Sequence, residues 1–350
     1  MLKIRKIALI LCCLLGLLPA LAGCAPKKTE PMGKAYFTYF DTVSYVYSYA
    51  GDPEEQFESR SAQVSGILEF YHKLFDIYHE YSGMNNLCTV NRQAGGEPVP
   101  VDEALIEFLL YAKELYARTG GEMNIMLGSV LRVWHDCRTA AAENPASAAL
   151  PDGQALAEAA AHTDISLLEI DEEKRTVRIT DPEASIDVGA VGKGYATEKA
   201  AQHLARQGIS GYVLNIGGNI RAIGTKPDGS GWITGVRNPM DPDGVYAARL
   251  RLKDTACVTS GSYERYFTVD GVRYHHIIDP DTLWPADFFV SITVITRDSG
   301  LADALSTALF CMPYEEGKAL VEGLEGVEVL WILPDGQQRF SSGFSELLIE

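Results

Sequence analysis

Apolar residues change their spacing about halfway along this sequence, and that change limits the folds that the chain can adopt. Up to about residue 165 they mostly recur at the helical spacing of three and four, whereas later they alternate with polar residues in short runs typical of strands. We expect helices at 56–81, 101–119, 155–161, 191–207 and 301–311, and one that includes 131–138. We expect strands at 36–49, 166–170, 176–180, 185–188, 212–216, 220–223, 232–237, 246–252 and 290–296. Helices followed by strands predict an α+β fold, and the turn pairs Asp270-Gly271 and Asp335-Gly336 predict two more antiparallel hairpins.

Net charge excludes one class of function and restricts another. The chain has 350 residues, with 30 Lys and Arg against 47 Asp and Glu, a formal net charge of −17. So acidic a protein lacks the basic face that sequence-independent nucleic-acid binding needs, and we expect no nucleic-acid partner. An anionic substrate is still compatible with this net charge, provided that a metal ion or backbone N–H groups neutralise the substrate locally.

The first 23 residues have the pattern of an export signal, with three basic residues, an apolar run over 7–18 and then small residues. Residues 21–24 (LAGC) resemble a bacterial lipobox, in which Cys24 becomes the lipidated first residue of the mature chain. We expect a lipoprotein signal peptide at 1–23, a tether at 24–34 and one domain at 35–350. The protein would be exported and lipid-anchored to the outer face of the cell membrane, or on the periplasmic side. An uncleaved N-terminal transmembrane helix is the alternative.

The cysteines beyond residue 24 are widely separated, and their spacing matches no zinc site. We expect buried thiols, although one disulfide is compatible with an exported protein. These residues are Cys88, Cys137, Cys257 and Cys311.

The segment DVGAVGKGY at 187–195 is a first candidate for anion binding. Gly189 and Gly192 allow the backbone to approach a ligand, the expected helix offers free N–H groups, and Lys193 adds a positive charge. The spacing matches neither G-x-G-x-x-G nor G-x-x-x-x-G-K-[ST]. A plain strand-to-helix turn explains the segment equally well.

Two further strand ends carry small polar residues and glycine, at 215–219 (NIGGN) and 259–261 (TSG). Each is compatible with an ordinary turn. Ligands often bind at strand ends, so three such endings together favour a phosphate or nucleotide cleft.

Two adjacent histidines, His275 and His276, precede the sequence IIDP. Neighbouring side chains of a strand point to opposite faces, so the two have different surroundings. A histidine is the usual proton acceptor for a hydroxyl nucleophile, and an ordinary core or surface histidine is the alternative.

Asp303 and Thr307 stand four residues apart in an apolar expected helix, so both oxygens lie on one helix face. A buried Asp needs a partner, and a hard cation is one solution. Carboxylate, hydroxyl and backbone carbonyl oxygens suit Mg²⁺. An Asp bonded to the backbone or to an Arg is the alternative.

Taken together, these segments resemble the FAD:protein FMN transferase (ApbE) family over about residues 36–344. The most specific matches are DVGAVGKGYATEKA, YVLNIGGNI, VTSGSYERYF, YHHIIDP and ADALSTALF, in the family's order and spacing. The resemblance implies a single large α+β domain of the ApbE type (T-fold-like), mostly antiparallel sheet with flanking helices, and FAD bound in a cleft.

The resemblance also implies roles for individual residues. Mg²⁺ would be held by the Ala190 carbonyl, Asp303 and Thr307, and His276 would activate the acceptor hydroxyl. Tyr81 matches an aromatic that contacts FAD, and 122–124 matches a backbone stretch that lines the nucleotide. The implied FAD-binding positions are Phe40, Tyr81, Glu122, Met123, Asn124, Asp187, Lys193 and Ile278.

Three segments depart from the family pattern. Its usual Met-Gly-Thr is 40–42 (FDT) here, its Phe-Asp-x-Thr is 123–126 (MNIM), and the Thr-Gly after HIIDP-x is Thr282-Leu283, followed by Trp284. These departures affect the flavin-ring environment and the acceptor-facing loops rather than the metal and phosphate site.

The activity that the resemblance implies is transfer of FMN from FAD to a Thr or Ser hydroxyl of a target flavoprotein. The product would be a phosphoester, and AMP would leave. The expected target carries an FMN-binding domain, as in an electron-transport subunit or an extracellular reductase. Two alternatives stay open: an FAD pyrophosphatase that uses water as acceptor, and a non-catalytic flavin- or solute-binding lipoprotein.

Overall fold

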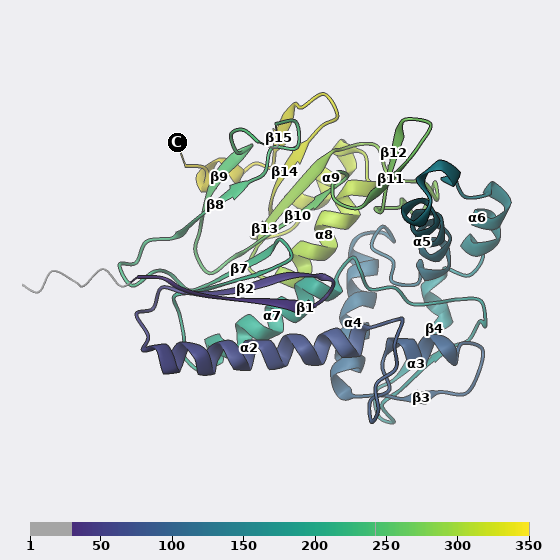
Figure 1. Ribbon diagram of the computed structural model, residues 1–350, viewed down its shortest axis with the longest axis horizontal. Coiled ribbons are helices and arrows are strands. Elements are labelled where there is room, and N and C mark those ends of the chain that lie inside the picture. Colours follow the sequence, from purple (N-terminus) through teal and green to yellow (C-terminus); the bar gives the residue numbers. More distant parts are fainter. Residues whose placement is uncertain (1–29, 242, 350) are drawn as a thin grey trace, which may run out of the picture.

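An eight-stranded sheet is the largest element of the fold (Figure 1). The computed structural model describes residues 30–241 and 243–349. Across the sheet the strands are β1 (Met32–Tyr39), β2 (Thr42–Ser48), β6 (Tyr212–Ile216), β7 (Asn219–Ile223), β10 (Ala256–Gly261), β13 (Ser291–Thr296), β14 (Glu328–Ile332) and β15 (Gln338–Phe340). Their spatial order is the order of the chain, and neighbouring strands pair antiparallel.

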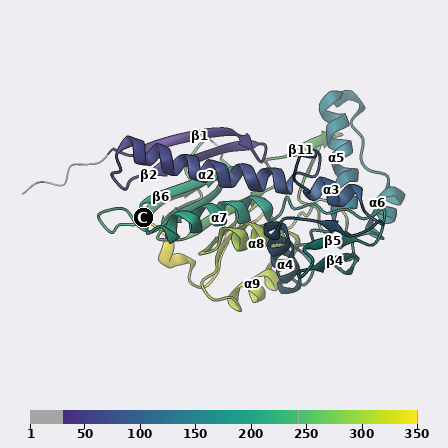
Figure 2. The ribbon, with the colours of Figure 1, turned by 90° about the horizontal axis from the view of Figure 1, so that it is seen from below.

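Three helices pack along one face of this sheet (Figure 2). They are α2 (Glu54–Phe75), α7 (Gly192–Arg206) and α8 (Ser299–Cys311). α7 contacts both α2 and α8, and α8 lies on β10 and β13. Glycine, alanine and serine make up much of the buried surface of α7 and α8, and such small residues let helices approach closely.

The chain between β2 and β6 forms a mostly helical region beside the sheet (Figure 1). Besides α2 and α7 it contains α3 (Leu87–Arg92), α4 (Glu103–Arg118), α5 (Gly128–Glu143), α6 (Gly153–Ala160) and a small sheet of β3 (Val99–Pro100), β5 (Thr176–Ile179) and β4 (Leu168–Asp171). Later elements are the hairpins β8–β9 (Trp232–Val236, Ala248–Leu252) and β11–β12 (Tyr266–Val269, Val272–His275), and helix α9 (Tyr314–Glu322). Short 3₁₀ turns lie at Pro145–Ser147, Ile165–Leu167 and Phe344–Leu347.

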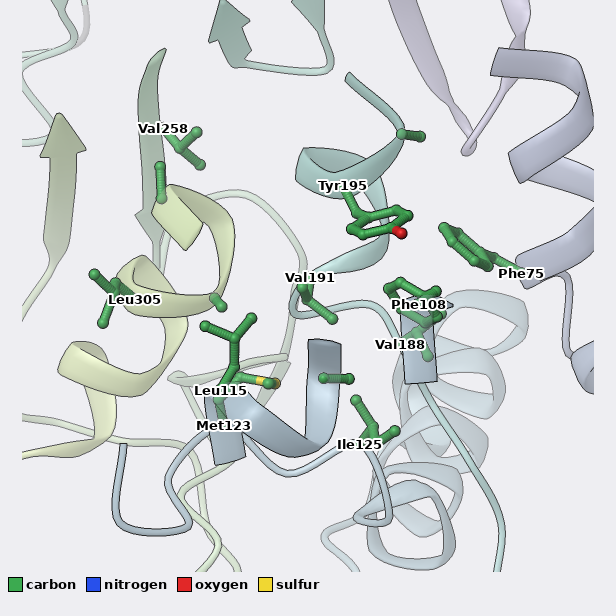
Figure 3. Packing of buried hydrophobic residues seen from close by; sticks show 14 of the residues in the cluster. Phe75, Phe108, Leu115, Met123, Ile125, Val188, Val191, Tyr195, Val258 and Leu305 are labelled. Carbon is green, nitrogen blue, oxygen red and sulfur yellow. The ribbon is translucent and has the colours of Figure 1, made fainter. Parts of the chain in front are cut away.

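An aromatic cluster fixes the start of α7 (Figure 3). The ring of Phe108 lies 4.1 Å from that of Phe75 and 5.0 Å from that of Tyr195, measured between centroids. Val188 and Val191 are also buried in this core, whereas Gly189 between them is exposed. The core therefore holds the two valines and turns the backbone between them outward.

The predicted α+β class with dominant antiparallel pairing is confirmed. Helices expected at 101–119, 155–161, 191–207 and 301–311 are α4, α6, α7 and α8, with ends shifted by no more than three residues, and α5 contains 131–138. Both hairpins expected from an Asp-Gly turn are present, as β11–β12 and β14–β15.

The strand expected at 36–49 was wrong, because this segment is a hairpin of two strands. Phe40 and Asp41 have φ angles of 53° and 52°, and this left-handed pair makes the tight turn that joins β1 to β2. β1 also begins at Met32, so residues 32–34 belong to the sheet and not to the expected tether.

The helix expected at 56–81 was too long. It ends at Phe75, because Asp76 adopts an extended backbone (φ −66°, ψ 121°) and its carboxylate accepts hydrogen bonds from the N–H groups of Tyr78 and His79. Apolar residues beyond that point mimic a helical pattern without forming a helix.

The strand expected at 185–188 is absent, because a side chain takes the place of a strand partner. The Asn91 amide donates to the Ile186 carbonyl at 2.9 Å, and its oxygen accepts from the Ile186 N–H at 2.8 Å. Helices α3 and α9 were not expected.

All four cysteines within the described residues are free thiols, so the disulfide option is not realised among them. Cys88, Cys257 and Cys311 are buried, and Cys137 is half-buried. In the same residues no helix combines the length and apolar character needed to cross a membrane. The predicted signal peptide and Cys24 lie outside the described residues.

Candidate active site

Asp303 lies where α7 and α8 make their closest approach. The Gly194 N–H on α7 donates to Asp303 Oδ2 at 2.7 Å. A Cβ atom at Gly194 would lie 2.3 Å from the Ser299 carbonyl oxygen and 2.4 Å from the Asp303 Cβ, so only glycine fits there. The close approach therefore holds a buried carboxylate against the first turn of α7.

This hydrogen bond also frees a backbone oxygen. In a regular helix the Gly194 N–H would donate to the carbonyl of Ala190, four residues back, but here it donates to Asp303. Meanwhile the N–H groups of Gly192 and Tyr195 donate to Val188 and Val191. The Ala190 carbonyl is thus available at the helix start for another partner.

Burial raises the pKa of Asp303, whereas nearby positive and polar groups favour its ionised form. Lys193 Nζ lies 3.7 Å from Asp303 Oδ1, and the Gly194 N–H and the Asn219 amide act in the same direction. The Asn219 Nδ2 atom is buried without a geometrically adequate hydrogen bond to any described residue. The site is built to hold a carboxylate that has a positively charged neighbour.

The donor set at this point fits Mg²⁺. Asp303 supplies a carboxylate, the partly exposed Thr307 lies one turn further along α8, and the Ala190 carbonyl is free of its helical partner. No group of three or more His, Cys, Asp or Glu side chains able to hold a metal ion occurs in the described part of the chain. A hard cation here would therefore rely on one carboxylate and neutral oxygens.

Of the two adjacent histidines, His276 has a ring nitrogen available. His275 ends β12, and its Nε2 lies 2.8 Å from the Ala286 carbonyl while its Nδ1 accepts from the Ile277 N–H at 3.2 Å. His276 Nδ1 lies 3.3 Å from the carbonyl oxygen of Arg265. Donation from Nδ1–H to that carbonyl leaves His276 Nε2 as a proton acceptor.

The surroundings of His276 favour its neutral form. Burial and the neighbouring Arg265, His275, Arg138 and Lys193 together lower its pKa to about 3. Arg138 belongs to α5 and Lys193 to the first turn of α7. A neutral imidazole is the form that a general base requires.

Asp187 lies in the same region, held by its backbone. Its N–H donates to the Ile125 carbonyl at 2.8 Å, and its Oδ1 accepts from the Gly189 N–H at 2.8 Å. Burial raises the pKa of Asp187, against the opposing influence of Gly189 and of His135, Arg138 and Arg265. Asp187 thus joins the predicted site to a group of cations that the sequence did not indicate.

Tyr81 is placed differently from the other predicted residues. Its hydroxyl donates to Asp76 Oδ2 at 2.8 Å, and burial together with this carboxylate raises the pKa of Tyr81 to about 12. Tyr78, which was not predicted, is the tyrosine whose charge environment includes Asp187 and Arg138. The end of α2 at Phe75 is what brings Tyr78 to the site.

Of the predicted positions at 122–124, Met123 and Asn124 have their side chains occupied. Met123 is fully buried in the core (Figure 3). The Asn124 amide donates to the Thr163 carbonyl at 2.9 Å. Burial and the nearby Asp281, Asp279 and Glu316 raise the pKa of Glu122 to about 7. Glu122 Oε2 has no hydrogen-bond partner among the described residues, so its carboxyl and the backbone of this stretch are left to face a ligand.

The last two predicted positions lie at the margins of these elements. Ile278 is buried and forms an isolated bridge to Pro285. Phe40 lies at the tip of the β1–β2 hairpin, where its N–H donates to His72 Nδ1 at 3.3 Å.

A cavity of about 780 Å³ adjoins this region, and its volume suits a small-molecule ligand. Tyr78, Asn91 and Ser185 line it, together with residues from α5 and α6. Its lining ends at Ser185, two residues before Asp187 in the chain, and includes none of the predicted site residues.

A family profile described as the ApbE family matches residues 41–331. The FAD:protein FMN transferase of Treponema pallidum (strain Nichols) is 32% identical over 316 residues, which covers 86% of this chain and 84% of that protein. One from Klebsiella pneumoniae (strain 342) is 28% identical over 331 residues, covering 93% and 92%.

Solved structures also resemble this chain over most of its length. The ApbE protein of Thermotoga maritima superposes with a TM-score of 0.80 at 28% identity, covering 92% of this chain and all of that one. The flavin transferase ApbE from Vibrio cholerae gives 0.75 at 28% identity, covering 91% and 99%.

Proposed function

This chain belongs to the ApbE family, and from that membership we propose that it is an FAD:protein FMN transferase. It would transfer FMN from FAD to a Thr or Ser hydroxyl of a target flavoprotein, with release of AMP. The observation that carries the proposal is the contact of α7 with α8, which places Asp303, Lys193 and a free carbonyl together.

We propose that the Ala190 carbonyl, Asp303 and Thr307 hold Mg²⁺. When bound, the ion would supply charge neutralisation for the pyrophosphate and the departing AMP. The exposed Gly189 directly before Ala190 allows close approach of backbone to phosphate, and the Lys193 ammonium adds positive charge from the first turn of α7.

His276 would act as the general base. The acceptor hydroxyl gives its proton to Nε2 as its oxygen bonds to the FMN phosphorus, and the bond from that phosphorus to the bridging oxygen breaks. AMP takes that oxygen with it. Phosphate charge beside Arg138, Arg265 and Lys193 would raise the pKa of His276 and strengthen it as a base.

Intact mass spectrometry tests the proposal. Purified protein, FAD, Mg²⁺ and a candidate acceptor domain are incubated, and we expect an FMN-sized mass gain on the acceptor and an equal amount of AMP. Asp303→Ala should lose this gain, whereas Asp171→Ala, which removes an exposed carboxylate of the β4–β5 hairpin, should keep it. Full transfer by Asp303→Ala would refute the metal site.

The same assay separates the alternatives. AMP release without any acceptor protein would indicate an FAD pyrophosphatase. Stoichiometric FAD binding without AMP over hours would indicate a flavin-binding lipoprotein. We propose as acceptors an electron-transport subunit or an extracellular reductase with an FMN-binding domain, reached from a lipid anchor at Cys24 on the outer face of the membrane.

A further inference from the structure

We propose that Arg138 and Arg265 form a second binding position for the FAD pyrophosphate, one that acts without the metal ion. This inference rests on the proposed function. The sequence resemblance gave neither arginine a role, although Arg265 lies in the matched segment VTSGSYERYF. The two come from separate elements, α5 and the segment before β11.

Packing of α5 against the β11–β12 hairpin brings the two arginines together. The ring of Trp134 on α5 lies 6.3 Å from that of Phe267 and 6.2 Å from that of Tyr274. Its Nε1 donates to the Leu283 carbonyl at 2.9 Å. Arg138 follows Trp134 by one helical turn, and Arg265 directly precedes β11, so both reach the margin of this contact.

His276 lies at the same place. Its Nδ1 is 3.3 Å from the backbone carbonyl of Arg265, so the candidate general base and this arginine share one turn of chain. The presence of Arg138, Arg265 and Lys193 among the groups that lower the pKa of His276 agrees with that placement. The arginines therefore lie near the candidate general base.

Neither arginine has a carboxylate partner within 4.0 Å among the described residues. Arg138 is half-buried and its closest recorded contact is His135 Nδ1, at 3.0 Å from Nη2. Its pKa is lowered by burial and by Arg265. Arg265 is exposed, and within the described part of the chain Asp187 is the one carboxylate in the surroundings of Arg138. The cluster therefore keeps an excess of positive charge beside a partly buried guanidinium, and a bound anion would neutralise it.

Phosphate fits this pair better than a carboxylate side chain does. A guanidinium binds two phosphate oxygens in parallel, and two guanidiniums match the spread charge of a pyrophosphate. The half-exposed ring of Tyr78, with its centroid 5.7 Å from that of His135, adds a flat surface beside them for an aromatic part of the same ligand. These features together favour a dinucleotide.

Equilibrium binding without turnover tests the inference. The dissociation constants of FAD and of riboflavin, which has no phosphate, are measured in EDTA by flavin fluorescence for wild type, Arg138→Ala, Arg265→Ala and Arg138→Lys. We expect the two alanine variants to weaken FAD binding about tenfold each, with a smaller loss for Arg138→Lys and no change for riboflavin.

Arg118→Ala is the matched control, because it removes an exposed positive charge of α4 that pairs with Glu114 at 2.9 Å. It should leave both constants unchanged. The inference fails if Arg138→Ala and Arg265→Ala bind FAD as Arg118→Ala does, or if riboflavin binding weakens as much as FAD binding. Weaker FAD binding by wild type at higher salt would support it without any variant.

Failure here and failure of the proposed function have different signatures. If the wild type transfers FMN and the variants bind FAD unchanged, only the proposed role of the arginine pair is contradicted. Phosphate-dependent FAD binding without transfer to any acceptor would support binding by the arginine pair and contradict the proposed transferase activity.

Discussion

At the scale of single residues, Asp303 and His276 have opposite surroundings. Asp303 is a buried acid with a raised pKa, beside Lys193 and an N–H donor. His276 is a base whose pKa is lowered to about 3 by burial and by cations. An anion that carries a metal ion would suit both at once, because it would add negative charge near the histidine and positive charge near the aspartate.

His276→Gln is expected to reduce FMN transfer by about 100-fold or more, since a positioned general base contributes that much. FAD binding should persist, because Nε2 acts on the acceptor hydroxyl. Steady-state transfer rates and FAD titrations measure the two effects. His203→Gln at the end of α7 should behave as wild type, and a His276→Gln variant with full activity would contradict the role.

The lowered pKa of His276 also predicts the pH profile. The free enzyme keeps this ring neutral well below the ordinary histidine value of 6.5, so kcat/KM should show no acid limb from His276 near that pH. A limb near 6.5 that disappears in His276→Gln would contradict the prediction.

Glu122 should make stability depend on pH. Its folded pKa of about 7 exceeds the ordinary value of 4.5, so between these values the unfolded chain ionises first and the free energy of unfolding falls as pH rises. Glu122→Gln removes this loss and should stabilise the protein by about 1–2 kcal/mol at pH 8 and by little at pH 4. Urea unfolding measures it, with the exposed Glu173→Gln as control.

Individual site residues were predictable where a short motif fixes them. Spacing of four in an apolar helix indicated Asp303 and Thr307, and adjacent residues of a strand indicated that His275 and His276 differ. Arg138, Arg265 and Tyr78 were not predictable, because their proximity depends on how α5, a hairpin and the end of α2 pack in space.

At the scale of elements, the contact of α7 with α8 depends on Gly194. Gly194→Ala would place a methyl group against the Ser299 carbonyl, and we expect a loss of about 1–3 kcal/mol of stability together with weaker stimulation by Mg²⁺. Gly66→Ala in α2 is the matched control, because a Cβ there would meet no atom within 4 Å, and it should stabilise the helix slightly.

Thermal unfolding and Mg²⁺ titration of transfer measure both glycine variants. Equal stability of Gly194→Ala and wild type would show that the helices separate freely, which would contradict the close approach.

Helices and strands were predictable from the sequence where the local residue pattern was sufficient. The Asp-Gly turns and the helices α4, α7 and α8 needed no tertiary information. The hairpin at 32–48 was missed because its turn residues, Phe40 and Asp41, give a weaker signal than Asp-Gly, and Asn91 replaces a strand partner of Ile186 from 95 residues away.

At the scale of the whole molecule, the acidic chain concentrates positive charge in one place. Its net charge is −17, yet Lys193, Arg138 and Arg265 all influence the one ring of His276. Such an arrangement confines anion binding to the site and repels anions elsewhere.

Cys24 should determine where the whole molecule resides. Cys24→Ser is expected to move the protein from the membrane fraction to the soluble fraction of its host if the lipobox is processed. Fractionation and mass analysis of the N-terminus check this, with Cys88→Ser as control. Membrane retention of Cys24→Ser would favour an uncleaved N-terminal helix instead.

Strand order determines when each part of the large sheet can form during synthesis. Six of the seven strand pairings in this sheet join strands that are close in sequence, but β2 must wait for β6, since Ser48 pairs with Tyr212. At roughly 5–20 residues per second, the intervening chain takes on the order of ten to thirty seconds to make. During that interval the Tyr- and Val-rich edge of β2 has no neighbour, and an unpaired edge of this kind readily pairs with another chain. Chaperone protection of the nascent hairpin is therefore expected to affect the yield of folded protein.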